Sequence, residues 1–94
     1  MQIRYYLDAE TGLPHFYEHG VLEEEVRDIL RQPGERRPGR KNSQIAMGQT
    51  TAGRYLCVIY SLDDDGDGIF VITAYPMSGK SLKAYRRQRR RRQR

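Results

Sequence analysis

Cysteine is scarce in this chain, and long apolar segments are absent. The single cysteine, Cys57, excludes an internal disulfide within the 94 residues, which favours a reducing compartment. No apolar run approaches the roughly 18–20 residues that cross a bilayer, and the first residues lack the apolar stretch of a secretion signal. These absences predict a single cytoplasmic domain without a membrane segment. Because Cys57 lies in the apolar run 55–60, we interpret it as a small core residue and not as a reactive thiol.

Acidic residues are missing from the last fifteen positions, which carry nine lysines and arginines and a net charge of +9. Residues 1–79 hold eight basic and twelve acidic residues, which gives a net charge of −4. The overall charge of +5 therefore conceals a mildly acidic body joined to a strongly cationic end. A block of this kind attracts polyanions.

The hydrophobic periodicity predicts the secondary structure. Strands are expected over 3–7, about 14–17, 44–49, 55–61 and 69–75. Leu22, Val26, Ile29 and Leu30 form one apolar stripe, so we expect a helix over 22–31 that ends before Pro33-Gly34. Residues 35–43 are interpreted as a polar loop, and a last helix is expected from about residue 81.

The connections between these elements indicate the fold class. Thr51-Ala52-Gly53 predicts a hairpin into the strand 55–61, which is apolar on both faces and therefore central in the sheet. Pro76 ends the last strand because proline lacks the amide hydrogen that a ladder needs. We predict an α+β domain with a small antiparallel sheet of about four strands, one helix after the first strand and a C-terminal basic helix. Residues 1–85 are expected to form this domain, and residues 86–94 an arginine-rich extension of the last helix.

Two segments that suggest a ligand have incomplete motifs. The segment 63–68 places aspartates and a glycine as the first half of an EF-hand calcium loop does, but the position that needs a bidentate glutamate is Ala74, and the flanks are strands. Gly79-Lys80-Ser81 lacks the glycine that a phosphate loop places five residues earlier. We therefore expect no metal and no cofactor, and we interpret 63–68 as a solvated turn.

Two histidines, His15 and His19, lie four positions apart. Without a third ligand this spacing is a weak signal for zinc. An imidazole ordinarily exchanges protons near neutral pH, so His19 is a candidate for acid–base chemistry. The alternative is that His19 only caps or orients the helix that follows.

The basic end is the strongest chemical signal in the sequence. Arginine presents a planar fork of donors that fits phosphate oxygens and stacks on bases, and Tyr75 and Tyr85 are candidates for stacking on exposed bases. The candidate phosphate-binding residues are Arg54, Lys80, Lys83, Arg86, Arg87, Arg89 and Arg90. Two alternatives stay open: the segment docks on an acidic protein partner, or it has no role.

A series of short motifs resembles a known family. The series consists of His19-Gly20-Val21, Gly48-Gln49-Thr50, Gly53-Arg54-Tyr55-Leu56, Val58-Ile59-Tyr60, Val71-Ile72-Thr73-Ala74 and Tyr85. Over residues 15–88 it resembles domain of unknown function 4258, a group that is similar to BrnT-type toxins with a RelE-like fold. The resemblance implies a helix packed against an antiparallel sheet. It also implies a metal-independent ribonuclease that acts on mRNA, in association with the ribosome, as the toxin of a toxin–antitoxin pair.

These observations lead to one prediction and one alternative. We predict an RNA-directed, toxin-like domain that acts as a metal-independent endoribonuclease, with His19 as the acid or base and Tyr75 or Tyr85 assisting; its partners are RNA and an antitoxin protein. BrnT-like chains usually carry arginine at the position of Tyr75, and Glu-Arg where this chain has Ser81-Leu82. The alternative is therefore a non-catalytic module that binds RNA or a protein partner.

Overall fold

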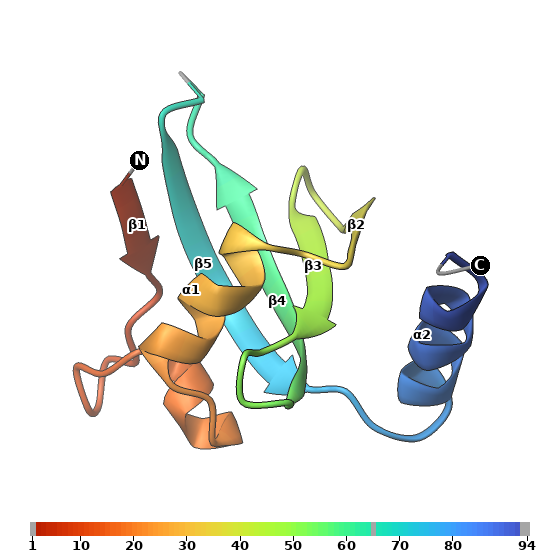
Figure 1. Cartoon of the computed structure of the whole chain (residues 1–94). Helices are drawn as coiled ribbons and strands as arrows, with labels where there is room; N and C mark the ends of the chain where they lie inside the picture. The colour runs from red at the N-terminus through yellow and green to blue at the C-terminus, as the bar shows by residue number, and fades with distance from the viewer. Residues whose placement is uncertain (1, 65, 93–94) are drawn as a thin grey trace.

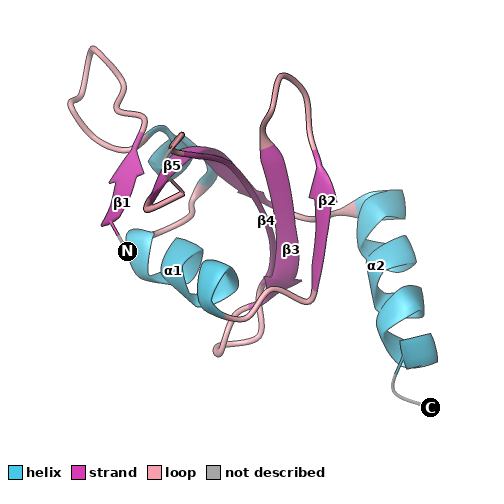
Figure 2. Cartoon of the chain, turned by 90° about the horizontal axis from the view of Figure 1, so that it is seen from above, coloured by secondary structure: helices cyan, strands magenta, loops and turns pink. Residues whose placement is uncertain are grey.

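The computed structural model describes residues 2–64 and 66–92, with side chains as far as residue 90. A five-stranded sheet lies between two helices (Figures 1 and 2). The elements in chain order are β1 (Gln2–Tyr5), the 3-10 helix η1 (His15–His19), α1 (Glu23–Arg31), β2 (Glu35–Pro38), β3 (Gln44–Gln49), β4 (Tyr55–Leu62), β5 (Gly68–Pro76) and α2 (Gly79–Arg92). Over the described part of the chain, no helix is both long enough and apolar enough to cross a membrane.

The sheet is mixed, and its strand order is β1-β5-β4-β3-β2. β3, β4 and β5 form the expected antiparallel meander, and β4 is the central strand, as its apolar composition predicted. β1, however, pairs in parallel with β5, from Gln2 opposite Gly68 to Tyr5 opposite Val71. The α+β class is therefore confirmed, whereas the prediction of an antiparallel sheet of about four strands is wrong.

The fifth strand, β2, lies in the segment that we interpreted as a polar loop. It pairs antiparallel with β3, from Glu35 opposite Met47 to Pro38 opposite Gln44. β2 is an edge strand and most of its side chains are exposed, so burial imposes no apolar alternation that the sequence could reveal. Proline is tolerated at such an edge.

α1 covers the inner face of the sheet, where Val26 and Ile29 are fully buried. Its first turn is capped by the Glu25 carboxylate, which accepts a hydrogen bond from the Leu22 amide at 3.0 Å. α1 covers residues 23–31, so the helix that the apolar stripe predicted over 22–31 is confirmed. The buried residues of this inner core are Phe16, Val21, Val26, Ile29, Ala46, Leu56, Val58, Tyr60, Ile69, Val71 and Ala74.

A 3-10 helix replaces the extended segment that was expected over 14–17. Pro14 forms an isolated bridge with Leu7, and η1 follows at once. Phe16 points into the inner core and is 1% exposed, so η1 is held against the sheet by one aromatic side chain. Gly20, at a φ of +73°, then turns the chain toward α1.

The outer face of the sheet, opposite α1, carries a smaller cluster formed by Met47, Cys57, Met77 and Tyr85. The predicted burial of Cys57 is confirmed. α2 begins at Gly79, two residues before the expected start, and continues without a break to Arg92. Residues 86–92 of the basic extension are thus helical, while 93 and 94 lie outside the described residues.

Candidate nucleic-acid interface

α2 is a helix of like charges that is anchored by few apolar side chains. Leu82 and Tyr85, three positions apart, face the sheet, and Tyr85 is 5% exposed. Lysines and arginines occupy most other positions, and the helix contains no acidic residue. Because neighbouring cations repel one another along a helix, the packing of Leu82 and Tyr85 has to hold the charged helix against the sheet.

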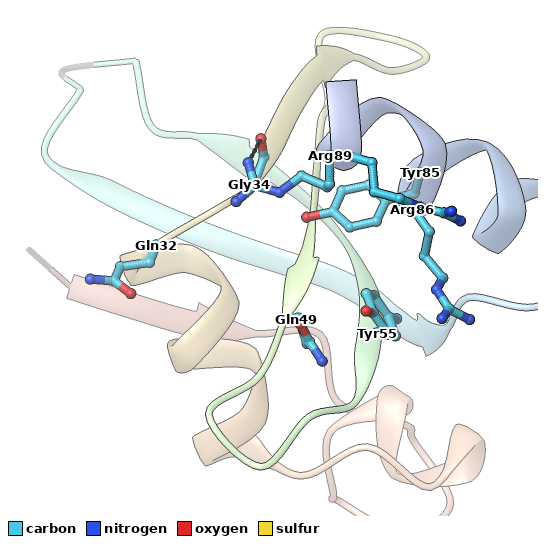
Figure 3. Close-up of a pocket in the computed structure, with 8 residues that line it drawn as sticks. Gln32, Gly34, Gln49, Tyr55, Tyr85, Arg86 and Arg89 are labelled. Carbon is cyan, nitrogen blue, oxygen red and sulfur yellow. Dashed lines mark hydrogen bonds between the residues drawn. The ribbon is translucent and has the colours of Figure 1, made fainter. Parts of the chain in front are cut away.

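The docking of Tyr85 depends on a glycine. The ring lies edge-on to the Tyr55 ring, with centroids 5.9 Å apart at an interplanar angle of 70°, and its hydroxyl end reaches the backbone at Gly34. A β-carbon at position 34 would lie 3.0 Å from Cζ of Tyr85 and closer still to its hydroxyl oxygen. Gly34 therefore leaves the space that the phenol occupies (Figure 3).

A pocket of about 390 Å³ opens between α2 and the sheet, within the range of ordinary small-molecule sites. The guanidinium carbon of Arg86 lies 5.7 Å from the centroid of the Tyr55 ring. Arg89 Nη1 donates a long hydrogen bond of 3.5 Å to the Gly34 carbonyl. The lining residues are Gln32, Gly34, Gln49, Tyr55, Tyr85, Arg86, Arg89 and Arg90, seven of which are labelled in Figure 3.

The pocket combines guanidinium groups, aromatic rings and side-chain amides. Guanidinium groups bind phosphate oxygens, aromatic rings stack on bases, and amides hydrogen-bond to base edges. Tyr55, Gln32 and Gln49 were not among the predicted site residues. The alternation of β3 does place Gln49 on the same face as Met47, but only the strand register shows that this face meets α2.

The structure separates the predicted phosphate-binding residues into three groups. Arg86, Arg89 and Arg90 line the pocket. Three residues of the same helix are exposed and lie outside it, namely Lys80, Lys83 and Arg87. Arg54 is engaged elsewhere: its Nη1 lies 2.8 and 2.9 Å from the two carboxylate oxygens of Glu25 and 3.0 Å from the Gly20 carbonyl. Arg54 therefore ties the start of α1 to the hairpin before β4.

Two of the three predicted catalytic residues lie together. His19, which is exposed at the end of η1, has its ring centroid 6.4 Å from that of Tyr75. Tyr75 is 39% exposed, and a hydrogen bond to the Cys57 side chain, with partial burial, raises the pKa of its phenol above the ordinary value. This phenol is therefore protonated at neutral pH. Tyr85, the third, is 5% exposed and lies in the contact between α2 and the sheet.

The His19–Tyr75 pair and the pocket share the outer face of the sheet. Tyr75 is paired with Cys57 across β5 and β4, and Tyr55 lies two residues before Cys57, so all three side chains project from one face. Diagonal neighbours of this kind have side chains about 7–8 Å apart. The pocket and the pair are therefore adjacent regions of one surface.

A third cluster lies beside His19 and was not predicted. His15 Nδ1 lies 2.8 Å from Asp8 Oδ1 and 3.9 Å from Glu18 Oε2, and the His15 and His19 rings are edge to face with centroids 5.4 Å apart. The ligating atoms of Asp8, His15 and Glu18 all lie within 4.8 Å of one another. The spacing of the two histidines was visible in the sequence, but the approach of Asp8 depends on how the loop after β1 folds.

The described residues of the aspartate-rich segment 63–68 lie at the connection between β4 and β5, where the Gly66 amide donates to the Asp63 carbonyl at 2.8 Å. The Asp63 carboxylate is paired with the guanidinium of Arg4, and the Asp63 amide donates a hydrogen bond to the Gly68 carbonyl at 2.9 Å. Asp65, the third aspartate of this segment, lies outside the described residues. Asp63 is thus used to connect this turn to β1.

No family model matches this chain, and searches of curated proteins and of solved structures also find no match. The resemblance to domain of unknown function 4258, to BrnT-type toxins and to the RelE-like fold therefore stays a prediction. What the chain does has to be argued from the outer face itself.

Proposed function

We propose that this chain is an RNA-directed, toxin-like domain that binds RNA in the pocket under α2 and cleaves it without a metal at the neighbouring His19–Tyr75 pair. The observation that supports the proposal most strongly is the pocket itself. Three arginines and two tyrosines converge there, on the face of the sheet that also carries Tyr75, whose ring centroid lies 6.4 Å from that of the exposed His19 imidazole.

Binding would follow from the chemistry of the lining residues. A base would stack near Tyr55, whose ring already lies beside the Arg86 guanidinium, and adjacent phosphates would contact Arg86, Arg89 and Arg90. Each phosphate neutralised on a single strand releases counterions and adds about 0.7 to the slope of log K against log salt. The exposed Lys80, Lys83 and Arg87 would add long-range attraction without positioning the strand.

Cleavage would use the groups at the other side of this surface. Metal-free cleavage needs a base for the 2′-hydroxyl, an acid for the leaving oxygen and cations for the charge that develops on phosphorus. His19 would supply acid or base, Tyr75 would donate from its protonated phenol, and the arginines of the pocket would supply the cations. Tyr85 is buried in the helix contact, so its part in the proposal is to hold α2 in place.

The binding half of the proposal is tested by comparing two arginines of one helix. Arg86→Ala removes a cation from the pocket, whereas Arg87→Ala removes the same charge from an exposed position outside it. We expect Arg86→Ala to weaken binding of a mixed-sequence single-stranded RNA by about tenfold, as for the loss of a charge-assisted contact. Arg87→Ala should cost clearly less. Equal losses would show that only net charge matters and that the pocket is not the binding site.

The cleavage half is tested with the same RNA in EDTA. We expect the wild-type protein to cut the substrate and His19→Ala to bind it with unchanged affinity but without cutting. Full activity of His19→Ala would remove His19 from the reaction. Binding without any cleavage, by the isolated protein and with ribosomes added, would reject the enzyme and leave the binding function.

The second candidate function is a non-catalytic module that binds RNA or an acidic protein such as an antitoxin. The observation that favours it is the exposure of Lys80, Lys83 and Arg87, which present cations to solvent outside the pocket. It predicts that deletion of residues 86–94 abolishes binding, while His19→Ala and Tyr75→Phe have no effect. Salt-sensitive co-purification with the product of a neighbouring gene would support the protein partner.

A further inference from the structure

The segment between β1 and η1 contributes little apolar surface to the core. Tyr6, Leu7 and Leu13 are each about half exposed. Backbone contacts close the segment instead: Leu7 forms a bridge with Pro14, and the Asp8 amide donates to the Leu13 carbonyl at 2.9 Å. Small domains often fasten such segments with a disulfide or a metal ion, and a single cysteine excludes an internal disulfide here.

Three side chains with metal-ligating atoms converge where this segment meets η1. His15 Nδ1 lies 2.8 Å from Asp8 Oδ1 and 3.9 Å from Glu18 Oε2, and the ligating atoms of all three residues lie within 4.8 Å of one another. The Asp8 and His15 side chains are only 19% and 32% exposed. The backbone holds His15 in place, because its amide donates to the Tyr6 carbonyl at 3.0 Å.

The spacing of these atoms fits a tetrahedral zinc ion. Zinc bonds to imidazole nitrogen and carboxylate oxygen are about 2.0–2.2 Å long, so two ligand atoms at a tetrahedral angle lie about 3.4 Å apart. The two distances from His15 Nδ1, 2.8 and 3.9 Å, lie on either side of that value. Rotation of the side chains by about half an ångström would bring the three atoms to the zinc spacing.

The charge of the cluster also favours a divalent cation. Two carboxylates face one imidazole, and among the described residues the ion pairs recorded for Asp8 and Glu18 involve His15 alone. The arginines that form ion pairs are bound to other carboxylates. The cluster therefore has more negative charge than its own cation can balance. An imidazole ligand favours zinc over magnesium or calcium, which prefer oxygen ligands alone.

We propose that Asp8, His15 and Glu18 bind one Zn²⁺ ion, with water at the fourth position. His15 Nδ1 gives its proton to water when the ion binds, and bonds from both residues to zinc replace its hydrogen bond with Asp8. The two carboxylates are the ligands that the spacing of His15 and His19 lacked in the sequence. The ion is structural, since it ties the segment after β1 to η1.

This site is independent of the proposed RNA function. RNA binding is assigned to the pocket under α2 and cleavage to His19 and Tyr75, none of which supplies a ligand to the ion. Phe16, which is 1% exposed, anchors η1 by a contact that does not involve the cluster. Failure of the zinc site would therefore leave the RNA proposal standing, and the reverse also holds.

The experiment titrates ZnCl₂ into the full chain, without an affinity tag and stripped of metal, by calorimetry at pH 7. We expect one ion per chain with a Kd of about 10 μM or tighter. His15→Gln should weaken binding by at least about 100-fold and Glu18→Gln by at least about tenfold, because even the loss of a residue that only orients a ligand costs 10–100-fold. Glu10→Gln removes an exposed carboxylate from the same segment and should match wild type.

Thermal unfolding gives a second readout. Saturating zinc should raise the Tm of wild type and Glu10→Gln by at least about 5 °C, whereas His15→Gln should show no shift and magnesium at the same concentration no effect. Because each protein is compared with and without zinc, a variant that is less stable from the start is still informative. Exchange of the Asp8 and His15 amide hydrogens should slow on zinc binding, as expected for an ion that fastens this segment.

Three outcomes would overturn the inference. Binding only above about 1 mM would mean that the cluster is not a site. Unchanged affinity in both His15→Gln and Glu18→Gln would place the ion elsewhere, for example at the aspartates of 63–67. An equal rise in Tm with magnesium would reduce the effect to screening of the carboxylates.

Discussion

Replacing Gly34 by alanine should loosen α2 without touching the inner core. Gly34 does not have a positive φ, so alanine is compatible with the backbone and the cost is steric. The new methyl group would face the phenol of Tyr85, 3.0 Å from Cζ and nearer to the hydroxyl, and would also lie 3.5 Å from the Met47 carbonyl. The Gly34 amide donates to that carbonyl at 2.8 Å, which prevents β2 from simply moving away. Tyr85 has to shift.

The expected cost is that of overpacking a well-packed site, about 1–3 kcal/mol. The clash is concentrated on the phenol oxygen, so Tyr85→Phe should relieve most of it. The Gly34→Ala/Tyr85→Phe double variant should therefore be more stable than the sum of the two single changes predicts, with an interaction energy above about 1 kcal/mol.

Urea denaturation of the four proteins measures these free energies of unfolding, and RNA binding provides an independent readout. Because Tyr85 and Gly34 both line the pocket, Gly34→Ala should lower RNA affinity, and the added Tyr85→Phe change should restore part of it. Additivity within about 0.5 kcal/mol would refute the reasoning, since it would mean that residue 34 and the phenol do not compete for the same space.

Three further predictions concern residues outside the pocket. Arg54→Ala should destabilise the fold by about 0.5–1 kcal/mol, as for a partly exposed ion pair, and leave RNA affinity unchanged; a large loss of affinity would return Arg54 to the binding site. A hydrogen bond from the Thr51 amide lowers the pKa of Asp28 below its ordinary 3.8, so this carboxylate stabilises the fold above that pH and ceases to do so as the pH falls below it. Asp28→Asn should accordingly reduce the difference between urea midpoints at pH 7 and pH 3. Burial raises the pKa of the Cys57 thiol, so a thiol reagent should react only as fast as the protein opens, and urea should accelerate the reaction.

The elements that the sequence predicted correctly are those whose burial follows a local period. The stripe from Val26 to Ile29 marked α1, and the unbroken apolar run of β4 marked a central strand. β2 escaped prediction because an edge strand with exposed side chains has the composition of a loop. The parallel pairing of β1 with β5 joins residues more than sixty positions apart, and no local pattern encodes such a choice of partner.

In the candidate site, too, the features with a local sequence pattern were predicted, and those that depend on contacts between distant segments were not. Charge composition was enough to select α2 as the candidate polyanion-binding element, because an uncompensated block of arginine is visible without a structure. The sequence did not show which face of the sheet α2 packs against. Tyr55 and Gln49 line the pocket because their side chains lie on the face of β4 and β3 that meets α2. Arg54 was grouped with the tail on charge alone, whereas its ion pair with Glu25 depends on a contact between distant segments.

The contacts that keep α2 docked on the sheet also form the pocket. A short helix of like charges is marginal in water, and here it is held by Tyr85 on a space that Gly34 leaves free. Polyanion binding would relieve the repulsion among Arg86, Arg89 and Arg90 while these side chains face the sheet, so ligand binding and helix docking stabilise the same state. Tyr55 takes part in both, since its ring packs edge-on with the Tyr85 ring and also lies beside the Arg86 guanidinium. The residues that anchor the helix and those that would bind RNA therefore form one contiguous unit, and we expect a change to the anchor to alter the proposed RNA affinity.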